Sequence, residues 1–284
     1  MVELTSCRLG GDLTGDRVRL ASRVRTAGAT LINAVGDYDL TNGATEIRTT
    51  DSELYFSVSE SEAVIKRVGS CSDSNLDRRQ AALFELTVSL IDDTARYYLD
   101  AYDLNGDEEK LAVAYNRQCV DRNISLLTEQ VCKPTGFKLR SLSLADGYRH
   151  YCRPVGGELI CLLDFSSTVC SYSFLYHNRP ILLGAVAGLS KNADATDDIN
   201  EACIIDITAT LKFQLAALFA SGKSALLSRI VISGPNADEK LLEHISSKMK
   251  APTEFPTLNS TLFAPGVVAE AGSYLVSLGL TVDG

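Results

Sequence analysis

The sequence has 284 residues, of which 45% are hydrophobic and 22% are charged, and it contains no tryptophan. This length allows a sizeable core, arranged as one large domain or as several modules. The 36 acidic residues outnumber the 27 basic ones, and the net charge of −9 opposes non-specific binding to nucleic acid or to anionic lipid. We therefore expect no nucleic-acid partner.

The eight cysteines are scattered along the chain, with no C-x-x-C pair and no clustering with the three histidines. Several of them lie inside apolar runs, which predicts a reducing compartment and no metal site. The N-terminus lacks the apolar core of a signal peptide, and the longest weakly polar run, Ile181–Leu189, is far short of the ~20 residues that cross a bilayer. We expect a soluble protein whose membrane contact comes only through a partner.

Residues 1–74 alternate in the manner of strands and show no helical period. The expected strands are Val2–Leu4, Val18–Val24, Gly36–Leu40, Glu46–Arg48, Leu54–Val58 and Ala63–Val68. Turns are expected around Gly10-Gly11, at Gly15-Asp16 and at Thr41-Asn42-Gly43, and a module boundary is expected at Ser70–Ser74.

A compact module is expected next, over about residues 75–144, in the order helix, strand, strand, helix, strand. Its expected elements are a helix through Leu83, Leu86 and Leu90, strands over Arg96–Leu104 and 111–115 joined at Asn105-Gly106, a helix through Val120, Ile124, Leu127 and Val131, and a strand over Phe137–Leu144.

The remaining residues predict an α/β arrangement that begins with a three-strand meander. In order, we expect strands over Leu159–Leu163, up to Tyr176 and over Ile181–Leu183, a polar loop over Ser190–Asp198, a helix through Ile204, Ile207, Leu211, Leu215 and Leu218 that ends near Ser221-Gly222, a strand over Arg229–Ser233, a helix through Leu241, Ile245 and Met249, and a last helix that Pro265 opens, with Val268, Ala271, Leu275 and Leu278 facing the core. A strand that ends in a glycine turn between two helices provides a crevice for a ligand at its carboxyl end.

Two turns in this part are candidate binding sites. In the first, the strand-end carboxylate is followed by three hydroxyl side chains, which could face a phosphate while the carboxylate holds a metal-bound water; its residues are Asp164, Ser166, Ser167 and Thr168. The second is Gly234-Pro235-Asn236. Turns of these residue types more often satisfy their own backbone. No histidine stands in a G-x-S-x-G or H-E-x-x-H frame.

Several segments together carry a family resemblance. They are Val2-Glu3-Leu4 with Val18-Arg19-Leu20 as a first hairpin, the strand pair Leu54–Val68, the module 75–144, the run Leu162–Thr168 and the strand and turn Arg229–Gly234. Their order resembles the type IV pilus assembly protein PilM family, which is actin-like and related to the division protein FtsA. In that family, Leu162–Thr168 corresponds to the second phosphate loop and Gly234 to the turn that meets the adenosine.

The resemblance implies a two-lobed, actin-like (ribonuclease H-like) α/β fold. Residues 1–74 would form a reduced first subdomain, 75–144 the inserted subdomain and 145–284 the second lobe. It further implies a cytoplasmic scaffold of a type IV pilus or related secretion platform, held at the inner membrane through a partner. That partner would be the cytoplasmic tail of a PilN-like membrane protein, bound between the first subdomain and the inserted module, beside other pilus platform proteins.

The departures from the family pattern concern the nucleotide site. The family has an Asp-x-Gly loop just before the Val2-Glu3-Leu4 hairpin, so we predict that the first phosphate loop is absent. Ser166 replaces a glycine of the second loop, and Pro235 removes an N–H donor from the adenosine turn. We therefore expect a degenerate nucleotide site that binds nucleotide weakly or not at all, no cofactor, and an ATPase activity that is weak or lost. One alternative is an ATPase that uses ATP with Mg²⁺; another is a related secretion-platform protein or a diverged relative without a pilus role.

Overall fold

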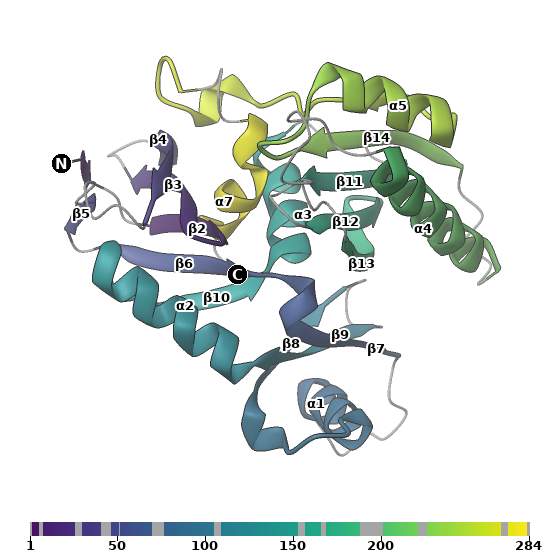
Figure 1. Cartoon of the computed structure of the whole chain (residues 1–284), viewed down its shortest axis with the longest axis horizontal. Helices are drawn as coiled ribbons and strands as arrows, with labels where there is room; N and C mark the ends of the chain where they lie inside the picture. The colour runs from purple at the N-terminus through teal and green to yellow at the C-terminus, as the bar shows by residue number, and fades with distance from the viewer. Residues whose placement is uncertain are drawn as a thin grey trace.

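The computed structural model describes residues 2–5, 8–25, 30–40, 47–50, 52–69, 77–104, 109–152, 157–165, 169–187, 201–220, 226–267 and 272–282. Two five-stranded sheets stand on either side of two central helices, and a smaller module extends from the first sheet (Figure 1). Each sheet has its own buried apolar cluster, and a third cluster fills the space around the central helices.

The first sheet has the strand order β10-β6-β2-β3-β4. Three strands form an antiparallel meander: β2 (Arg8–Thr14), β3 (Arg17–Arg25) and β4 (Thr30–Asp39). The strands β6 (Glu53–Val58) and β10 (Gly136–Leu139) extend it in parallel from β2. The expected strands over Val18–Val24 and Leu54–Val58 are thus confirmed.

The start of the chain differs from the expected hairpin. The strand β1 (Val2–Thr5) pairs in parallel with β5 (Ile47–Thr50) in a separate two-stranded sheet, and β3 pairs with β2 instead. The turn predicted around Gly10-Gly11 is wrong, because both glycines lie inside β2. A Cβ on Gly10 would lie 1.9 Å from the carbonyl oxygen of Ser277, so this strand needs glycine for close packing rather than for a turn.

The second sheet has the order β13-β12-β11-β14-β15. As in the first sheet, three strands form an antiparallel meander and two more extend it in parallel from the first strand of that meander. Its strands are β11 (Leu159–Phe165), β12 (Val169–Tyr176), β13 (Arg179–Ala187), β14 (Leu227–Ser233) and β15 (Thr253–Glu254). The predicted meander is therefore confirmed. Because β2 and β11 each begin the meander of their lobe, positions near their carboxyl ends are structurally equivalent.

Two helices, α4 (Glu201–Ala220) and α5 (Glu239–Met249), pack against the second sheet and supply its apolar cluster. All five apolar residues predicted for the first of these helices are buried. In α5, Leu241 and Ile245 are buried, and Asp238 caps the helix by accepting from the backbone N–H of Leu241 at 2.7 Å.

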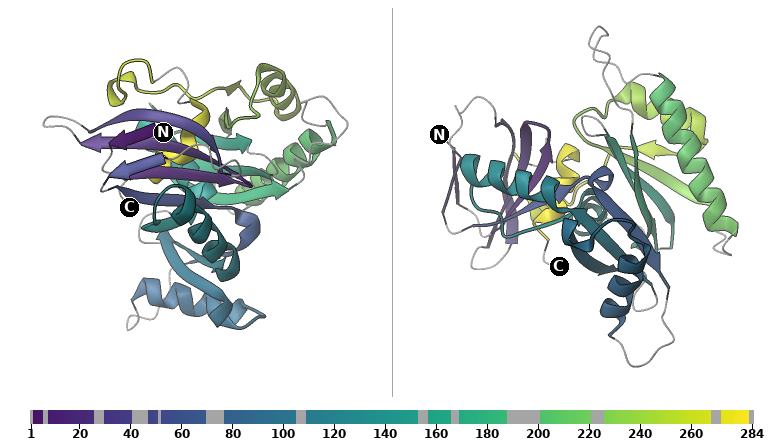
Figure 2. Two further views of the ribbon diagram at one scale, coloured as in Figure 1. Left: turned by 60° about the vertical axis from the view of Figure 1, so that its left-hand side comes forward. Right: turned by 60° about the horizontal axis from the view of Figure 1, so that its bottom comes forward.

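The inserted module is a three-stranded sheet in the order β7-β9-β8 covered by one helix. Its elements are β7 (Ala63–Val68), α1 (Arg78–Ser89), β8 (Tyr97–Asp103) and β9 (Lys110–Asn116). Figure 2 shows this module at one end of the first lobe. The helix α2 (Arg117–Gln130) contributes Val120 and Leu127 to the core that the module shares with the first sheet. The division at residues 74 and 144 stays a prediction.

The two central helices are α3 (Arg140–Tyr151) and α7 (Leu275–Leu280). They pack so closely that a Cβ on Gly279 would lie 1.7 Å from the carbonyl oxygen of Ser143. The strand predicted over Phe137–Leu144 is wrong beyond Leu139, where α3 begins. Since α3 is buried on most of its circumference, its sequence lacks the amphipathic period by which a helix is recognised.

The helix predicted to begin at Pro265 is also corrected, because residues 264–267 form a turn and α7 begins only at Leu275. The expected features at 41–43, 70–74, 105–106, 190–198 and 221–222 lie outside the described residues. None of the helices in the described part of the chain is both long and apolar enough to cross a bilayer.

Candidate functional site

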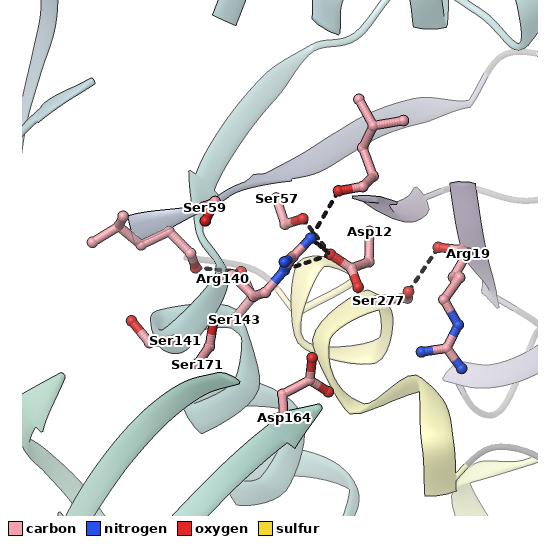
Figure 3. A network of polar contacts seen from close by, with 12 residues as sticks. Asp12, Arg19, Ser57, Ser59, Arg140, Ser141, Ser143, Asp164, Ser171 and Ser277 are labelled. Carbon is pink, nitrogen blue, oxygen red and sulfur yellow. Dashed lines mark hydrogen bonds and ion pairs between the residues drawn. The ribbon is translucent and has the colours of Figure 1, made fainter. Parts of the chain in front are cut away.

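The seam between the lobes holds two equivalent aspartates, Asp12 on β2 and Asp164 on β11, each with 1% of its surface exposed (Figure 3). Each Oδ1 accepts a hydrogen bond from a serine on the neighbouring parallel strand. Ser57 Oγ of β6 donates to Asp12 at 2.5 Å, and Ser233 Oγ of β14 donates to Asp164 at 3.0 Å. Each lobe thus contributes one aspartate and one serine in the same arrangement.

The first residue of α3, Arg140, forms an ion pair with Asp12. Its Nε lies 2.9 Å and its Nη2 2.8 Å from Asp12 Oδ1, and Nη2 also donates to the carbonyl oxygen of Leu13 at 2.7 Å. Burial alone lowers the pKa of Arg140, but the carboxylates of Asp12, Asp164 and Glu60 together raise it. The guanidinium therefore remains charged inside the seam.

The charged form of Asp164 is disfavoured by its surroundings. Burial, followed by the charge of Asp12, raises the pKa of Asp164 to about 6, although Arg140 and Arg19 act in the opposite direction. The Oδ2 atoms of Asp12 and Asp164 are buried and, within the described part of the chain, have no hydrogen-bond partner. Each of these atoms has a lone-pair direction that a water, a cation or another donor could satisfy.

A third buried carboxylate, Glu60, links the seam to the second lobe. It lies in the short 3-10 helix Glu60–Glu62 that follows β6. Its Oε1 accepts from the backbone N–H of Ser141 at 2.6 Å, and its Oε2 accepts from Ser171 Oγ of β12 at 2.7 Å. The carboxylate thus satisfies an amide at the start of α3, where the helix dipole favours negative charge.

The end of β11 lies beside the predicted turn after β14. Asp164 pairs with Ser233 in the sheet, and a Cβ on Gly234, whose φ is +101°, would lie 2.6 Å from the carbonyl oxygen of Phe165. The same carbonyl accepts from the backbone N–H of Asn236 at 3.3 Å. The structure therefore brings Asp164 and the Gly234 turn together, whereas Ser166, Ser167 and Thr168 lie outside the described residues.

Two clefts border this seam. One, of about 390 Å³, lies at the carboxyl end of β14; Gly234 lines it, but Pro235 and Asn236 are not among the described residues that do. The other, of about 330 Å³, lies between the first sheet, the segment around the short helix Glu60–Glu62, and α2. Its lining includes Gly15 of the β2–β3 turn, Ser59 of the link to the module, Arg122 and Leu126 of α2, and Arg140.

The sequence reasoning missed Asp12 and Arg140. The absence of the first phosphate loop stays a prediction, but β2 does supply an aspartate, Asp12, shortly before the Gly15 turn. A weak signal was present, since Asp12 stands three residues before a glycine that could open a turn, although no apolar run precedes it as one precedes Asp164. Arg140 was hidden because its segment reads as a strand.

In the described ranges, no three His, Cys, Asp or Glu side chains are placed to hold a metal ion together. The six described cysteines, Cys119, Cys132, Cys152, Cys161, Cys170 and Cys203, are all free thiols. Burial raises the pKa of the Cys152 thiol to about 12, which keeps it protonated at neutral pH.

No protein-family model matches the sequence, and none of the curated proteins matches it either. Solved structures do match the fold along almost the whole chain. A chain of the PilM–PilN type IV pilus biogenesis complex superposes with a TM-score of 0.72 at 11% identity, covering 97% of this chain and 97% of that chain.

Two further structures match over a similar length. A Bacteroides thetaiotaomicron protein with an actin-like ATPase fold has a TM-score of 0.55 at 8% identity, covering 97% of this chain and 96% of that one. The cytoplasmic domain of EpsL, an inner-membrane component of the Vibrio cholerae type II secretion system, has a TM-score of 0.52 at 12% identity, covering 98% and 96%. The chain has the actin-like fold, as expected from its sequence.

Proposed function

We propose that this protein is a cytoplasmic, actin-like scaffold of a type IV pilus or related secretion assembly platform. The observation that carries the proposal is the match over 97% of both chains to a chain of the PilM–PilN complex, with the EpsL domain as a second match from a secretion system. At these identities the likeness speaks for the fold, so the role rests on analogy. The partner would be the cytoplasmic tail of a PilN-like inner-membrane protein, which holds the scaffold at the membrane alongside other platform proteins.

The proposal includes a degenerate nucleotide site. Arg140 and Ser57 already engage the Oδ1 of Asp12, where a metal-bound water would need an acceptor. The β2–β3 turn carries the carboxylate of Asp16, which would repel a phosphate. In the adenosine turn, Pro235 has no N–H and the N–H of Asn236 is bonded to Phe165. These residues fit Mg-ATP poorly.

The alternative, a nucleotide-dependent ATPase, is favoured by one observation: Asp12 and Asp164 come from opposite lobes and each keeps a buried Oδ2 without a described partner. Such oxygens could accept from water bound to Mg²⁺ between the lobes. A thermal shift with Mg-ATP separates the two functions.

We place the partner tail in the cleft of about 330 Å³ beside α2, because the first sheet and α2, which belongs to the predicted module 75–144, both line this cleft. The half-buried side chain of Leu126 offers it an apolar contact, and the largely exposed guanidinium of Arg122, paired with Glu62 at 3.2 Å, borders its mouth. An extended tail with an apolar anchor and flanking polar residues would suit this lining.

Calorimetry with a synthetic PilN-type tail peptide tests this proposal, and gene neighbourhood would identify the peptide to use. The wild type should bind it, and Leu126→Glu should weaken binding at least about tenfold, since a charge would replace the apolar contact. Thr128→Glu is the matched control, because Thr128 is exposed on the same helix and does not line the cleft. Absence of any binding heat would count against the scaffold role, and equal weakening by both variants would count against the cleft.

A further inference from the structure

The helix α4 lies on the flank of the second lobe (Figures 1 and 2), and the side chains exposed along its outer face form a largely apolar stripe. Phe213 keeps 71% of its surface exposed and Ile205 keeps 48%, while the opposite face of the helix is buried in the core. The charged residues of the 20-residue helix are Glu201, Asp206 and Lys212. A long helix with so little charge on its exposed face is an unusual surface for a monomer.

The exposed positions follow the spacing of a helix-packing seam. Successive steps of four and three residues lead through Ala202, Asp206, Ala209, Phe213, Ala216 and Ala220, all of which are exposed. This spacing keeps side chains on one line along a helix and is the one that pairs two helices. Most of these side chains are alanines, so a second helix could approach closely.

Two copies of the stripe are complementary in charge when their helices run antiparallel and cross at Ala209. Asp206 and Lys212 lie three residues before and after Ala209, so an antiparallel copy centred there brings Lys212 of one chain level with Asp206 of the other. Neither charge forms an ion pair with another described residue. A parallel pairing would instead place like charges level, which is unfavourable.

The same arrangement accommodates the exposed aromatic ring. Phe213 of one copy lies opposite a hole on the other copy. Four side chains surround this hole, at a first position and at the positions three, four and seven residues after it. These positions are Ala202, Ile205, Asp206 and Ala209. A large side chain on one helix entering a hole that alanines leave open on the other is the packing that antiparallel helices use.

We propose that this protein forms a homodimer through α4, with the two helices antiparallel and the twofold axis passing beside Ala209. The partner is therefore a second copy of this chain. The contact is independent of the proposed pilus role and of the cleft beside α2. Because one helix pair buries less than the ~1,600 Å² of a standard interface, the dimer should be weak and concentration-dependent.

The test is the mass of the full chain in solution, measured by light scattering after gel filtration and by sedimentation equilibrium. The wild type should approach the dimer mass as its concentration rises to about 200 µM, and Phe213→Asp should weaken the dimer about 100-fold or more, because symmetry removes two buried rings. Phe84→Asp is the matched control: Phe84 of α1 is 66% exposed and should leave the mass unchanged. Circular dichroism verifies that both variants are folded.

A charge exchange tests the direction of pairing. Asp206→Lys and Lys212→Asp should each weaken the homodimer, whereas an equimolar mixture of the two variants should associate, because each Lys then faces an Asp at both levels. A wild type that stays monomeric at the highest concentration overturns the proposal. So does a dimer that Phe213→Asp leaves intact, or a mixture that associates no better than its components.

Discussion

The Nε atom of Arg140 lies 2.9 Å from Oδ1 of Asp12, which ties the first turn of α3 to the carboxyl end of β2. Both side chains are almost entirely buried, with 4% and 1% of their surfaces exposed. A buried ion pair stabilises little compared with apolar packing, but the loss of one member leaves an uncompensated charge. The pair therefore makes the seam sensitive to single substitutions.

Arg140→Met should lower the free energy of unfolding by about 3–5 kcal/mol, since it leaves Asp12 charged and buried. Urea unfolding measures the loss. Arg122→Met is the control, because Arg122 forms a surface pair with Glu62 and its side chain is 69% exposed; its cost should stay below about 1 kcal/mol. The double variant Asp12→Asn with Arg140→Met should recover part of the loss. If the double variant instead lost as much free energy of unfolding as the two single variants together, the two side chains would not be coupled.

Asp164 should make the protein less stable as the pH rises. Its pKa is raised from 3.8 to about 6, so between these values the folded state holds a proton that the unfolded state has released. Stability then falls with rising pH by up to about 1.4 kcal/mol per unit. Relative to the wild type, Asp164→Asn should therefore gain about 1–3 kcal/mol between pH 4 and pH 7, measured by urea unfolding at each pH. The exposed carboxylate variant Glu129→Gln should follow the wild-type profile, and a parallel profile for Asp164→Asn would refute the assignment.

Gly279→Ala should destabilise the contact between α3 and α7. A Cβ at this position would lie 1.7 Å from the carbonyl oxygen of Ser143. Because that oxygen belongs to the backbone, the clash can be relieved only if the two helices move apart. We expect a loss of about 3 kcal/mol or more, at the upper end of overpacking costs. Gly69→Ala, where a Cβ would meet nothing within 4 Å, should change stability by less than about 1 kcal/mol. Similar midpoints for both variants in thermal unfolding would show that the helices are less tightly packed.

Mg-ATP should leave the melting temperature of the wild type unchanged. At about 5 mM nucleotide, a site with a Kd of about 50 µM would add about 2.7 kcal/mol of stability and raise the melting temperature by several degrees. Scanning fluorimetry with Mg²⁺ alone as the blank measures this shift. A clear rise with ATP would favour the ATPase alternative over a degenerate site.

The elements that could be predicted from sequence are those with one buried face. The apolar positions of α4 recur at helical spacing because only one side of that helix meets the sheet. The meander over β11, β12 and β13 was similarly predictable, because short apolar runs there are separated by turn residues. By contrast, α3 is buried on nearly every side, so no period distinguishes it from a strand.

By itself the sequence determined the order of strands and helices from β11 to α5, the acidic balance and the aspartate near the end of β11. Only the tertiary structure decided that Asp12, Arg140 and Asp164 share one seam, since Asp12 and Arg140 are 128 residues apart and belong to different elements. Local patterns report which face of a segment is buried, whereas the pairing of buried charges depends on which strands and helices meet. In this protein the charges meet because two lobes of the same topology pack against α3 and α7.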